Sequence, residues 1–509
     1  MCAAFFIYSF IQQVNYINSK SKSKKKMATD LGYETVLKTH VAKERAAVKL
    51  TSKVGQLLYD KGIELVLFRN HLTDVTISEI LNLHEYAREV VNKPIDIFTT
   101  SELAEEILKL NLAPCKLDIG KLASEWLAAQ EKYDSKVTFL NDKLSNIGHS
   151  EDSSTEPRDV VLYGFGRIGR LAARELIKQA GKGQQLRLRA IVTRGSSDAD
   201  ITKRAALLRN DSVHGAFKGS VQADLPNKSL IINGQIVQMI DAKNPEDIDY
   251  TAYGISNALV IDNTGVYTDR AALSRHLQAN GVSKVLLTAP GKEIPNIVYG
   301  INHVDIDVEN EDIFSAASCT TNAISPVLKI INDTLGVVKG HIETVHAYTN
   351  DQNLLDNMHK SSRRGRSAAV NMVITSTGAG AAVTKVIPHL KDKLTANAVR
   401  VPTPNGSLAI LSLQIDKKTT VDEVNAIIKD AALNGELVNQ IYYSFDPELV
   451  SSDIIGNTCC SVYDSKATIV SVDGQNIVLY AWYDNEFGYT KQVIRLAKHV
   501  AQVRRAIYY

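Results

Sequence analysis

The sequence predicts an α/β protein in which a doubly wound parallel sheet is followed by an α+β domain with a mixed sheet, and a mostly helical extension precedes both. Three observations support this fold class. Apolar residues recur at helical spacing between residues 30 and 145. From residue 159 onward, strand and helix patterns alternate. A glycine-rich turn separates the first of these strands from the helix that follows it.

The composition favours a globular protein without a strongly charged partner. The length suggests about three domains as a soft prior, and 58 basic against 56 acidic residues leave a net charge of +2. This balance argues against nucleic acid and membrane surfaces as main partners. Five irregularly spaced cysteines form neither a disulfide framework nor a zinc pattern, so we expect no metal, a reducing compartment and a cytoplasmic location.

Residues 1–26 are predicted to be a disordered leader. An apolar stretch at 3–11 precedes a lysine-rich run at 20–26, which is the opposite order to a secretory signal peptide. A targeting segment or a membrane foothold is the alternative, although no segment approaches the ~20 apolar residues that span a bilayer.

Residues 27–148 are predicted to be a mostly helical extension that serves packing or assembly. Apolar stripes recur through it, and Thr76–Glu79 and Thr99–Glu102 resemble capping boxes. The polar, turn-rich segment 149–158 that follows is predicted to be a linker.

A buried strand at Asp159–Tyr163 leads into Gly164-Phe165-Gly166-Arg167-Ile168-Gly169, and a helix follows. The first glycine makes the tight turn, the second lets the backbone approach a pyrophosphate, and the third allows close helix–strand packing. The start of the helix then faces the phosphates. A tight turn without a ligand is the alternative. We predict a dinucleotide-binding domain at 159–317, with further strands at 187–193, 258–262, 284–288 and up to 315.

The segment Ser318-Cys319-Thr320-Thr321-Asn322 places one cysteine between hydroxyl groups at the expected start of a helix. A helix N-terminus lowers a thiol pKa and favours the nucleophilic thiolate. His346 stands on an apolar strand, and a cysteine–histidine pair is suited to covalent catalysis at a carbonyl carbon. For either residue alone, the alternative is a structural role in the core.

These residues belong to a predicted catalytic domain at 318–483. Its strands are expected at 340–348, 397–401, 407–415 and 477–483. A last helix at 485–504, within the segment 484–509, is expected to pack on the dinucleotide-binding domain.

Several motifs along residues 157–503 point to one family. They are Gly164–Arg170, Asp211–Gly215, Thr264–Tyr267, Ser318–Asn322, His346–Thr349, Arg400–Asn405 and Trp482–Tyr489. In their sequence, order and spacing, this part of the chain resembles the phosphorylating glyceraldehyde-3-phosphate dehydrogenase family. The helical extension lies outside the common family core and looks like that of a long bacterial branch.

The resemblance implies a covalent mechanism. Cys319 would attack an aldehyde to form a thiohemiacetal, and His346 would act as the base while hydride leaves for nicotinamide. The backbone N–H of Cys319 and the His346 ring would stabilise the oxyanion. Inorganic phosphate would then cleave the thioester and release an acyl phosphate. The implied substrates are glyceraldehyde 3-phosphate and inorganic phosphate, and the implied assembly is a homotetramer.

The resemblance also implies the remaining site residues. Thr349 and Arg400 match the substrate-phosphate site, and Asn485 matches the residue that orients the nicotinamide carboxamide. The residues that match the inorganic-phosphate site or its anion-binding segment are Ser318, Thr320, Thr377, Gly378 and Arg364. Taken singly, each hydroxyl residue has a cap or turn role as its alternative. The expected cofactor-binding residues are Gly164, Phe165, Gly166, Arg167, Ile168, Gly169, Arg194, Thr264 and Asn485.

Three departures from the family pattern bear on the cofactor and on phosphate. NAD-specific members carry an acid at the end of the second strand, where this chain has Arg194 followed by Gly195 and two serines. They also carry Leu-Pro where this chain has Asn357-Met358. We hypothesise that NADP is used, alone or alongside NAD. Third, the family's usual lysine is Ala381 here, and its loss is expected to weaken phosphate binding unless the change lies on the surface.

Other functions fit parts of the sequence. Erythrose 4-phosphate oxidation, with hydrolysis of the thioester, is a close alternative, and a relaxed cofactor site would also suit a mainly gluconeogenic role. A catalytically silent binding or regulatory protein that works through residues 30–145 belongs to a different class. The predicted catalytic residues are all present, which argues against that last reading.

Overall fold

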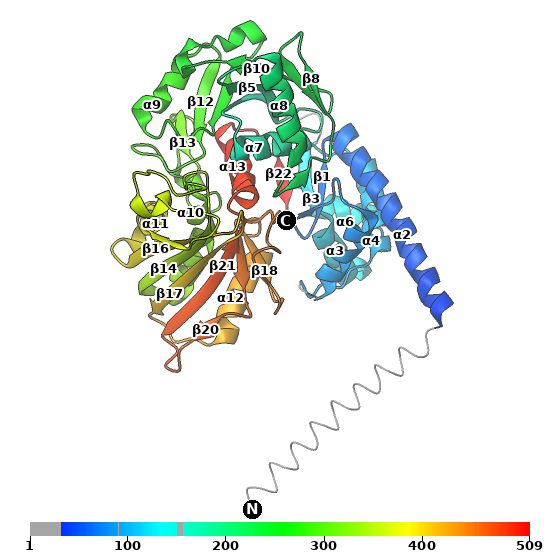
Figure 1. Cartoon of the computed structure of the whole chain (residues 1–509). Coiled ribbons are helices and arrows are strands. Elements are labelled where there is room, and N and C mark those ends of the chain that lie inside the picture. Colours follow the sequence, from blue (N-terminus) through cyan, green and yellow to red (C-terminus); the bar gives the residue numbers. More distant parts are fainter. Residues whose placement is uncertain (1–31, 90, 150–155) are drawn as a thin grey trace, which may run out of the picture. The chain divides into compact units, whose positions relative to one another are not determined.

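The computed structural model describes residues 32–89, 91–149 and 156–509 (Figure 1). They form two compact units. The first contains the described residues up to Ile147, apart from Ala113–Cys115, together with Tyr508, and the second contains the remainder. The leader predicted at 1–26 and most of the predicted linker lie outside the described residues.

The first unit is mostly helical, as predicted, but it also contains short strands. Its elements are α2 (Tyr33–Gln56), a π-helical turn (Leu57–Lys61), β1 (Glu64–Leu67), β2 (Asn70–His71), α3 (Ile77–Glu89), α4 (Ile97–Lys109), β3 (Cys115–Asp118), α5 (Ile119–Ala129), a 3-10 turn (Gln130–Lys132) and α6 (Lys136–Lys143). β1 pairs antiparallel with β2 and parallel with β3. The buried carboxylate of Asp118 ends β3 and caps α5, because it accepts hydrogen bonds from the backbone N–H groups of Gly120 and Lys121.

One of the two predicted capping boxes is confirmed. Thr76 and Glu79 exchange side-chain-to-backbone hydrogen bonds at the start of α3. The box predicted at Thr99–Glu102 is wrong, because α4 begins earlier and Asp96 is its N-cap, accepting a bond of 2.9 Å from the Thr99 backbone. An aspartate is at least as good an N-cap as a threonine and stands three positions ahead of it.

The second unit begins with an eight-stranded sheet in the order β13-β12-β11-β4-β5-β10-β9-β8. The strands are β4 (Arg158–Tyr163), β5 (Leu186–Thr193), β8 (Val221–Asp224), β9 (Ser229–Ile232), β10 (Gln235–Asp241), β11 (Ala258–Asp262), β12 (Val282–Leu287) and β13 (Ile313–Ser315). The pairs from β13 to β10 are parallel, and β9 and β8 add an antiparallel edge. The doubly wound parallel sheet is therefore confirmed.

Helices and short elements connect these strands. They are α7 (Arg167–Lys178), α8 (Asp198–Arg209), the two-residue strands β6 (Asn210–Asp211) and β7 (Gly215–Ala216), α9 (Arg270–Ser274), and 3-10 turns at Pro245–Asp247, Tyr250–Tyr253, Arg275–Gln278 and His303–Asp305. α7 starts directly after the glycine-rich turn, with Gly166 as its N-cap.

A second, mixed sheet follows in the order β15-β16-β14-β17-β21-β19-β18, with β20 paired to β21. Its strands are β14 (Val337–Ala347), β15 (Val373–Thr375), β16 (Leu394–Val401), β17 (Ser407–Ile415), β18 (Ile441–Ser444), β19 (Ser461–Asp464), β20 (Ile469–Val470) and β21 (Asn476–Tyr483). Its helices are α10 (Cys319–Leu335), α11 (Ala379–Val386) and α12 (Val421–Leu433), with 3-10 turns at Ser362–Gly365 and Pro388–Leu390. β14 is parallel to β16 and antiparallel to β17, so the mixed sheet is also confirmed.

The last helix, α13 (Phe487–Val500), lies beside α7 (Figure 1). Its apolar side chains, such as Val493, belong to the same core as Leu176 of α7. The buried Lys491 Nζ lies 2.7 Å from the buried Glu175 carboxylate of α7. The chain ends in β22 (Ala506–Tyr508). Among the described residues, none of the helices is long and apolar enough to cross a membrane.

Candidate active site

The structure brings Cys319 and His346 together. Cys319 is the first residue of α10, and the Ser318 hydroxyl caps that helix by accepting a 3.0 Å hydrogen bond from the Thr321 backbone. His346 is the penultimate residue of β14. The Sγ of Cys319 lies 3.7 Å from Nε2 of His346, which is within hydrogen-bonding reach for sulfur. The thiol and the imidazole can therefore exchange a proton directly.

The backbone ahead of Cys319 is strained and held in place. Ala317 has a φ of 55°, in the left-handed region that a residue with a Cβ rarely adopts. Its carbonyl accepts a 2.8 Å hydrogen bond from the Tyr489 hydroxyl of α13, and its N–H donates to Ser315. The Asn322 amide donates to the carbonyls on either side of Ala317. These contacts fix the point at which Cys319 enters the helix.

The electrostatic environment keeps both groups neutral. Burial raises the pKa of the Cys319 thiol, and the charge of Arg400 and the hydrogen bonds of Thr320 only partly offset this. Burial, and then the positive charge of Arg400, lower the pKa of His346 to about 3. The predicted lowering of the thiol pKa is therefore wrong as a net direction, because burial outweighs the helix start. The ring of His346 is therefore unprotonated near pH 7, which is the form that a general base needs.

Arg400 stands next to His346 because β14 and β16 are paired in register at these two residues. Its Nη1 lies 2.7 Å from Nδ1 of His346 and donates to the Ala347 carbonyl at 2.9 Å. Its Nε is buried and has no hydrogen-bond partner within the described part of the chain, and the same is true of the Thr403 hydroxyl. The Thr403 carbonyl accepts from Tyr348, the neighbour of the half-buried Thr349. Unpaired buried donors at this point suit an anionic ligand.

The other predicted phosphate residues lie on surrounding elements. Arg364 is paired with Asp351, and its Nε donates to Thr375 of β15 at 3.1 Å. Thr377 and Gly378 precede α11, which packs against α10, and Gly378 is its exposed N-cap. Ser318 caps α10, and the buried hydroxyl of Thr320 lies 3.0 Å from that of Tyr483. The exposed Ala381 lies on α11.

A cavity of about 390 Å³ opens where β4, β5 and β11 end, the edge at which doubly wound sheets bind nucleotides. It is lined by Tyr163, Gly164, Phe165, Val192, Thr193, Arg194, Arg204, Leu207, Ala242, Thr264, Val266 and Tyr267. Gly164 has a φ of 95°, and a Cβ on Gly169 would lie 2.4 Å from the Gly164 carbonyl oxygen, whereas a Cβ on Gly166 would meet open space. The glycines therefore form the cradle that a dinucleotide requires.

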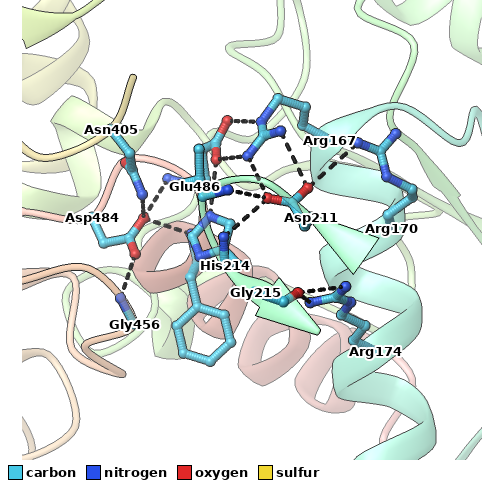
Figure 2. Close-up of polar contacts among 12 residues, drawn as sticks. Arg167, Arg170, Arg174, Asp211, His214, Gly215, Asn405, Gly456, Asp484 and Glu486 are labelled. Atoms are coloured by element: carbon cyan, nitrogen blue, oxygen red, sulfur yellow. Dashed lines mark hydrogen bonds and ion pairs between the residues drawn. The ribbon is translucent and has the colours of Figure 1, made fainter. Parts of the chain in front are cut away.

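The predicted cofactor residues occupy different positions around the cavity. Gly164, Phe165, Arg194 and Thr264 line the cavity, and Ile168 lies in the first turn of α7. The guanidinium of Arg167, in contrast, is held by Asp211, at 3.1 and 3.2 Å, and by Glu486 (Figure 2). The side chain of Arg167 is thus committed to carboxylates, and what it offers to a ligand is its backbone N–H. Asn485 is buried, and its side-chain oxygen accepts a 2.9 Å bond from Ser407.

Sequence reasoning missed several residues of this region. Arg204 lines the nucleotide cavity, Asp351 pairs with Arg364, and His214 and Glu486 complete the cluster around Arg167. His214 and Glu486 stand within two of the quoted motifs, but nothing in one sequence shows that residues so far apart meet.

Two family models match the chain. They are described as "Glyceraldehyde 3-phosphate dehydrogenase, NAD binding domain", over residues 158–270, and "Glyceraldehyde 3-phosphate dehydrogenase, C-terminal domain", over residues 318–485. Their separate domains agree with the two sheets of the second unit.

Relatives match over long stretches. A "Glyceraldehyde-3-phosphate dehydrogenase-like protein" of Pseudomonas aeruginosa is 46% identical over 454 residues, which cover 88% of this chain and 98% of the relative. That match is longer than the 352 residues from 158 to 509, so it includes part of the extension.

Two other relatives are shorter, and their matches do not include this part of the extension. "Glyceraldehyde-3-phosphate dehydrogenase 2" of Trichormus variabilis and "Glyceraldehyde-3-phosphate dehydrogenase 1" of Bacillus subtilis are 42% and 40% identical, and each match covers 67% of this chain and 98% of the relative. The chain therefore belongs to the glyceraldehyde-3-phosphate dehydrogenase family of NAD(P)-dependent oxidoreductases.

Proposed function

We propose that this protein is a phosphorylating glyceraldehyde-3-phosphate dehydrogenase, which oxidises glyceraldehyde 3-phosphate to an acyl phosphate. One observation carries the proposal: the 3.7 Å approach of Cys319 Sγ to His346, beside the partly unpaired guanidinium of Arg400. A nucleophile, a proton acceptor and an anion-binding group thus meet at one point. This combination suits an aldehyde whose molecule also carries a phosphate group.

The reaction divides among these groups as follows. The Sγ of Cys319 bonds to the aldehyde carbon, and the thiol proton passes through His346 to the new hydroxyl group. His346 then accepts the hydroxyl proton while the same carbon loses a hydride, which leaves a thioester. A phosphate oxygen attacks the thioester carbon, the C–S bond breaks, and the Cys319 thiolate returns. When bound, the nicotinamide ring supplies the hydride acceptor.

The hydrogen bonds of His346 suit this role. Its Nδ1 lies 2.6 Å from the Ala347 carbonyl oxygen. When Nδ1 carries the ring proton and donates it there, Nε2 is left as the acceptor that faces Sγ, and Arg400 Nη1 must then move off Nδ1 and donate to the Ala347 carbonyl alone. The rigid start of α10 presents Sγ to this nitrogen, so the nucleophile and the base need no large movement to react.

The phosphate groups are assigned to the residues around this pair. Thr349 and Arg400 hold the phosphate of the substrate. Ser318, Thr320, Thr377, Gly378 and Arg364 hold the attacking phosphate. Hydroxyls, backbone N–H groups and guanidinium are suitable ligands for both anions. Arg364 would exchange its pairing with Asp351 for the incoming anion.

Initial rates with glyceraldehyde 3-phosphate, measured with and without inorganic phosphate, test this function. We expect phosphate-dependent reduction of the cofactor, and a loss of about four orders of magnitude or more in Cys319→Ala. Cys459→Ala, which removes a buried thiol elsewhere, is the matched control and should remain active. Rates that do not depend on phosphate would support hydrolytic oxidation of erythrose 4-phosphate, and absence of reduction would support a binding protein.

We also propose that the nucleotide cavity accepts NADP, alone or alongside NAD. Arg194 and Arg204 both line it, and no carboxylate of the described residues does. Two cations favour the 2′-phosphate of NADP, whereas a carboxylate would favour the free ribose hydroxyls of NAD. Asn357-Met358, in place of the Leu-Pro of NAD-specific members, agrees with this. An Arg194→Asp variant should reverse the NADP:NAD preference, and an unchanged preference would refute the proposal.

Finally, we propose that the protein self-associates, with the homotetramer of the family as the expected state. The segment from residue 353 to 374 exposes several large apolar side chains, among them Met358 (92% exposed), Met372 (76%) and Leu355 (74%). Exposed apolar side chains that gather in one segment mark an interaction surface. Light scattering should give a mass near four chains, and Met358→Glu with Met372→Glu should lower it. A monomeric wild-type protein would contradict this.

A further inference from the structure

We infer that Glu486 is a positioning residue that joins the two ends of the cofactor site, so that the nicotinamide end is held in place by an ion pair to the helix at the pyrophosphate end. This inference rests on the proposed function. Glu486 directly follows Asn485, the residue expected at the nicotinamide, and precedes α13. Its carboxylate binds Arg167, which directly follows Gly166 at the start of α7.

The charged cluster around this ion pair is compact (Figure 2), and its acidic side chains are largely buried, whereas the Arg167 side chain is 29% exposed. Nη2 of Arg167 lies 2.6 Å from Oε2 of Glu486, and Nε2 of His214 lies 2.9 Å from the same oxygen. The side chains of Asp211, His214 and Glu486 are 6%, 5% and 11% exposed. A charge-assisted bond at such a site is stronger and less screened than one at the surface.

Asn485 and Glu486 lie in the same hydrogen-bonded turn, so the position of Asn485 depends on that of Glu486. Asp484, on the other side of Asn485, accepts hydrogen bonds of 2.8 to 2.9 Å from the backbone N–H groups of Gly456, Glu486 and Phe487. The same carboxylate accepts a 2.8 Å bond from the Asn405 side chain (Figure 2). These bonds tie Asp484, Asn485 and Glu486 into one turn, so that a movement of Glu486 carries Asn485 with it.

Arg167 depends less on this ion pair for its position than Glu486 does. Arg167 keeps two bonds to Asp211 when Glu486 is neutralised, and Asp211 is itself tied to the backbone N–H groups of Val213 and His214. Within residues 32–89, 91–149 and 156–509, Glu486 pairs with no second guanidinium, and its other partner is the imidazole of His214. Loss of the ion pair therefore loosens the Asn485 end and leaves the pyrophosphate end in place.

Binding measurements distinguish a residue that positions the nicotinamide end from one that stabilises the whole cofactor site. We would titrate wild type and Glu486→Gln with oxidised cofactor and with ADP-ribose, which lacks nicotinamide, and divide the dissociation constant for ADP-ribose by that for the cofactor. The expected result is that Glu486→Gln reduces this ratio about tenfold, while ADP-ribose affinity changes less than about threefold. Arg174→Met is the matched control, since Arg174 lies on α7 but donates only to the carbonyls of Leu208, Arg209 and Gly215. It should leave the ratio unchanged.

A second variant covers the case in which Glu486→Gln fails to fold. Arg167→Lys keeps the charge but loses the forked geometry, so it should reduce the ratio in the same direction by a smaller factor. Equal weakening of cofactor and ADP-ribose, or an unchanged ratio in both variants, would overturn the inference. The assay needs no turnover, so an inactive wild type that still shows the expected ratios would count against the proposed function alone.

Discussion

The sharpest consequence of the nucleotide cavity concerns Arg204, which sequence reasoning did not single out. Its Nε donates to the Thr193 hydroxyl at 3.2 Å and its Nη2 donates to the Arg194 carbonyl at 3.1 Å, so the guanidinium is already oriented at the end of β5. Asp200 lies 4.0 Å from it and competes only weakly. Arg204→Leu removes the positive charge and puts an apolar side chain in its place, next to Leu207 in the lining of the cavity.

The magnitude follows from the kind of bond that is lost. A hydrogen bond to a charged group contributes about 1.5 to 3 kcal/mol, and about 1.4 kcal/mol corresponds to a tenfold change in a dissociation constant. The Arg204 side chain is 20% exposed, so solvent screens part of its interaction with a phosphate and the lower end applies. We expect NADP to bind about tenfold more weakly to Arg204→Leu, and NAD to change less than about threefold.

Calorimetric titration of NADP and NAD against the same preparation measures this ratio. Arg209→Leu, on the last residue of α8 and outside the cavity lining, is the matched control. Equal weakening of NADP and NAD would refute the assignment of Arg204 to the 2′-phosphate.

Three further outcomes are expected. Ala381→Lys should lower the KM for phosphate roughly two- to fivefold, since a cation near a bound anion contributes about 0.5–1 kcal/mol; an unchanged KM would leave Ala381 a neutral surface change. Lys491→Met should lower the free energy of unfolding by about 3–5 kcal/mol, because it strands the buried Glu175 carboxylate; a loss below about 1 kcal/mol in urea denaturation would contradict this. Burial lowers the pKa of His303 to about 4, below its unfolded value of 6.5, so the unfolded state binds the proton first and the free energy of unfolding falls as pH drops through that window; His303→Asn should flatten the acid side of the stability curve, and an identical curve would argue against the shift.

Long, regular strands could be located from the sequence alone. The strands predicted at 258–262 and 407–415 match β11 and β17 residue for residue. The short β1, β2 and β3 were missed because strands of two to four residues carry too few alternations to be separated from the helices around them. The pairing of β1 with β3 also depends on partners about fifty residues apart, as the register of Glu64 with Lys116 shows.

The site residues that stand in local sequence motifs could be predicted. The contacts that depend on how distant strands pair could not. Cys319 and His346 each stand in a recognisable context, and they do meet. That Arg400 touches His346 follows from the register of β14 and β16, which no single sequence reveals. The thiol pKa was misjudged for a related reason: the helix start is visible in the sequence, but the burial that outweighs it is a property of the packed domain.

Arg167 shows that the position of a side chain in a motif does not give its partners. In the structure, Arg167 and Arg170 face the carboxylates of Asp211 and Glu486, so the two cations of this cluster are balanced by two anions. The field that remains at the start of α7 is that of its unpaired backbone N–H groups and its dipole. On the proposed function, a pyrophosphate would be recognised by the backbone, and the Arg167 side chain would hold α7 against Glu486. Neutralising Glu486 should for this reason disturb the far end of the cofactor more than its phosphates.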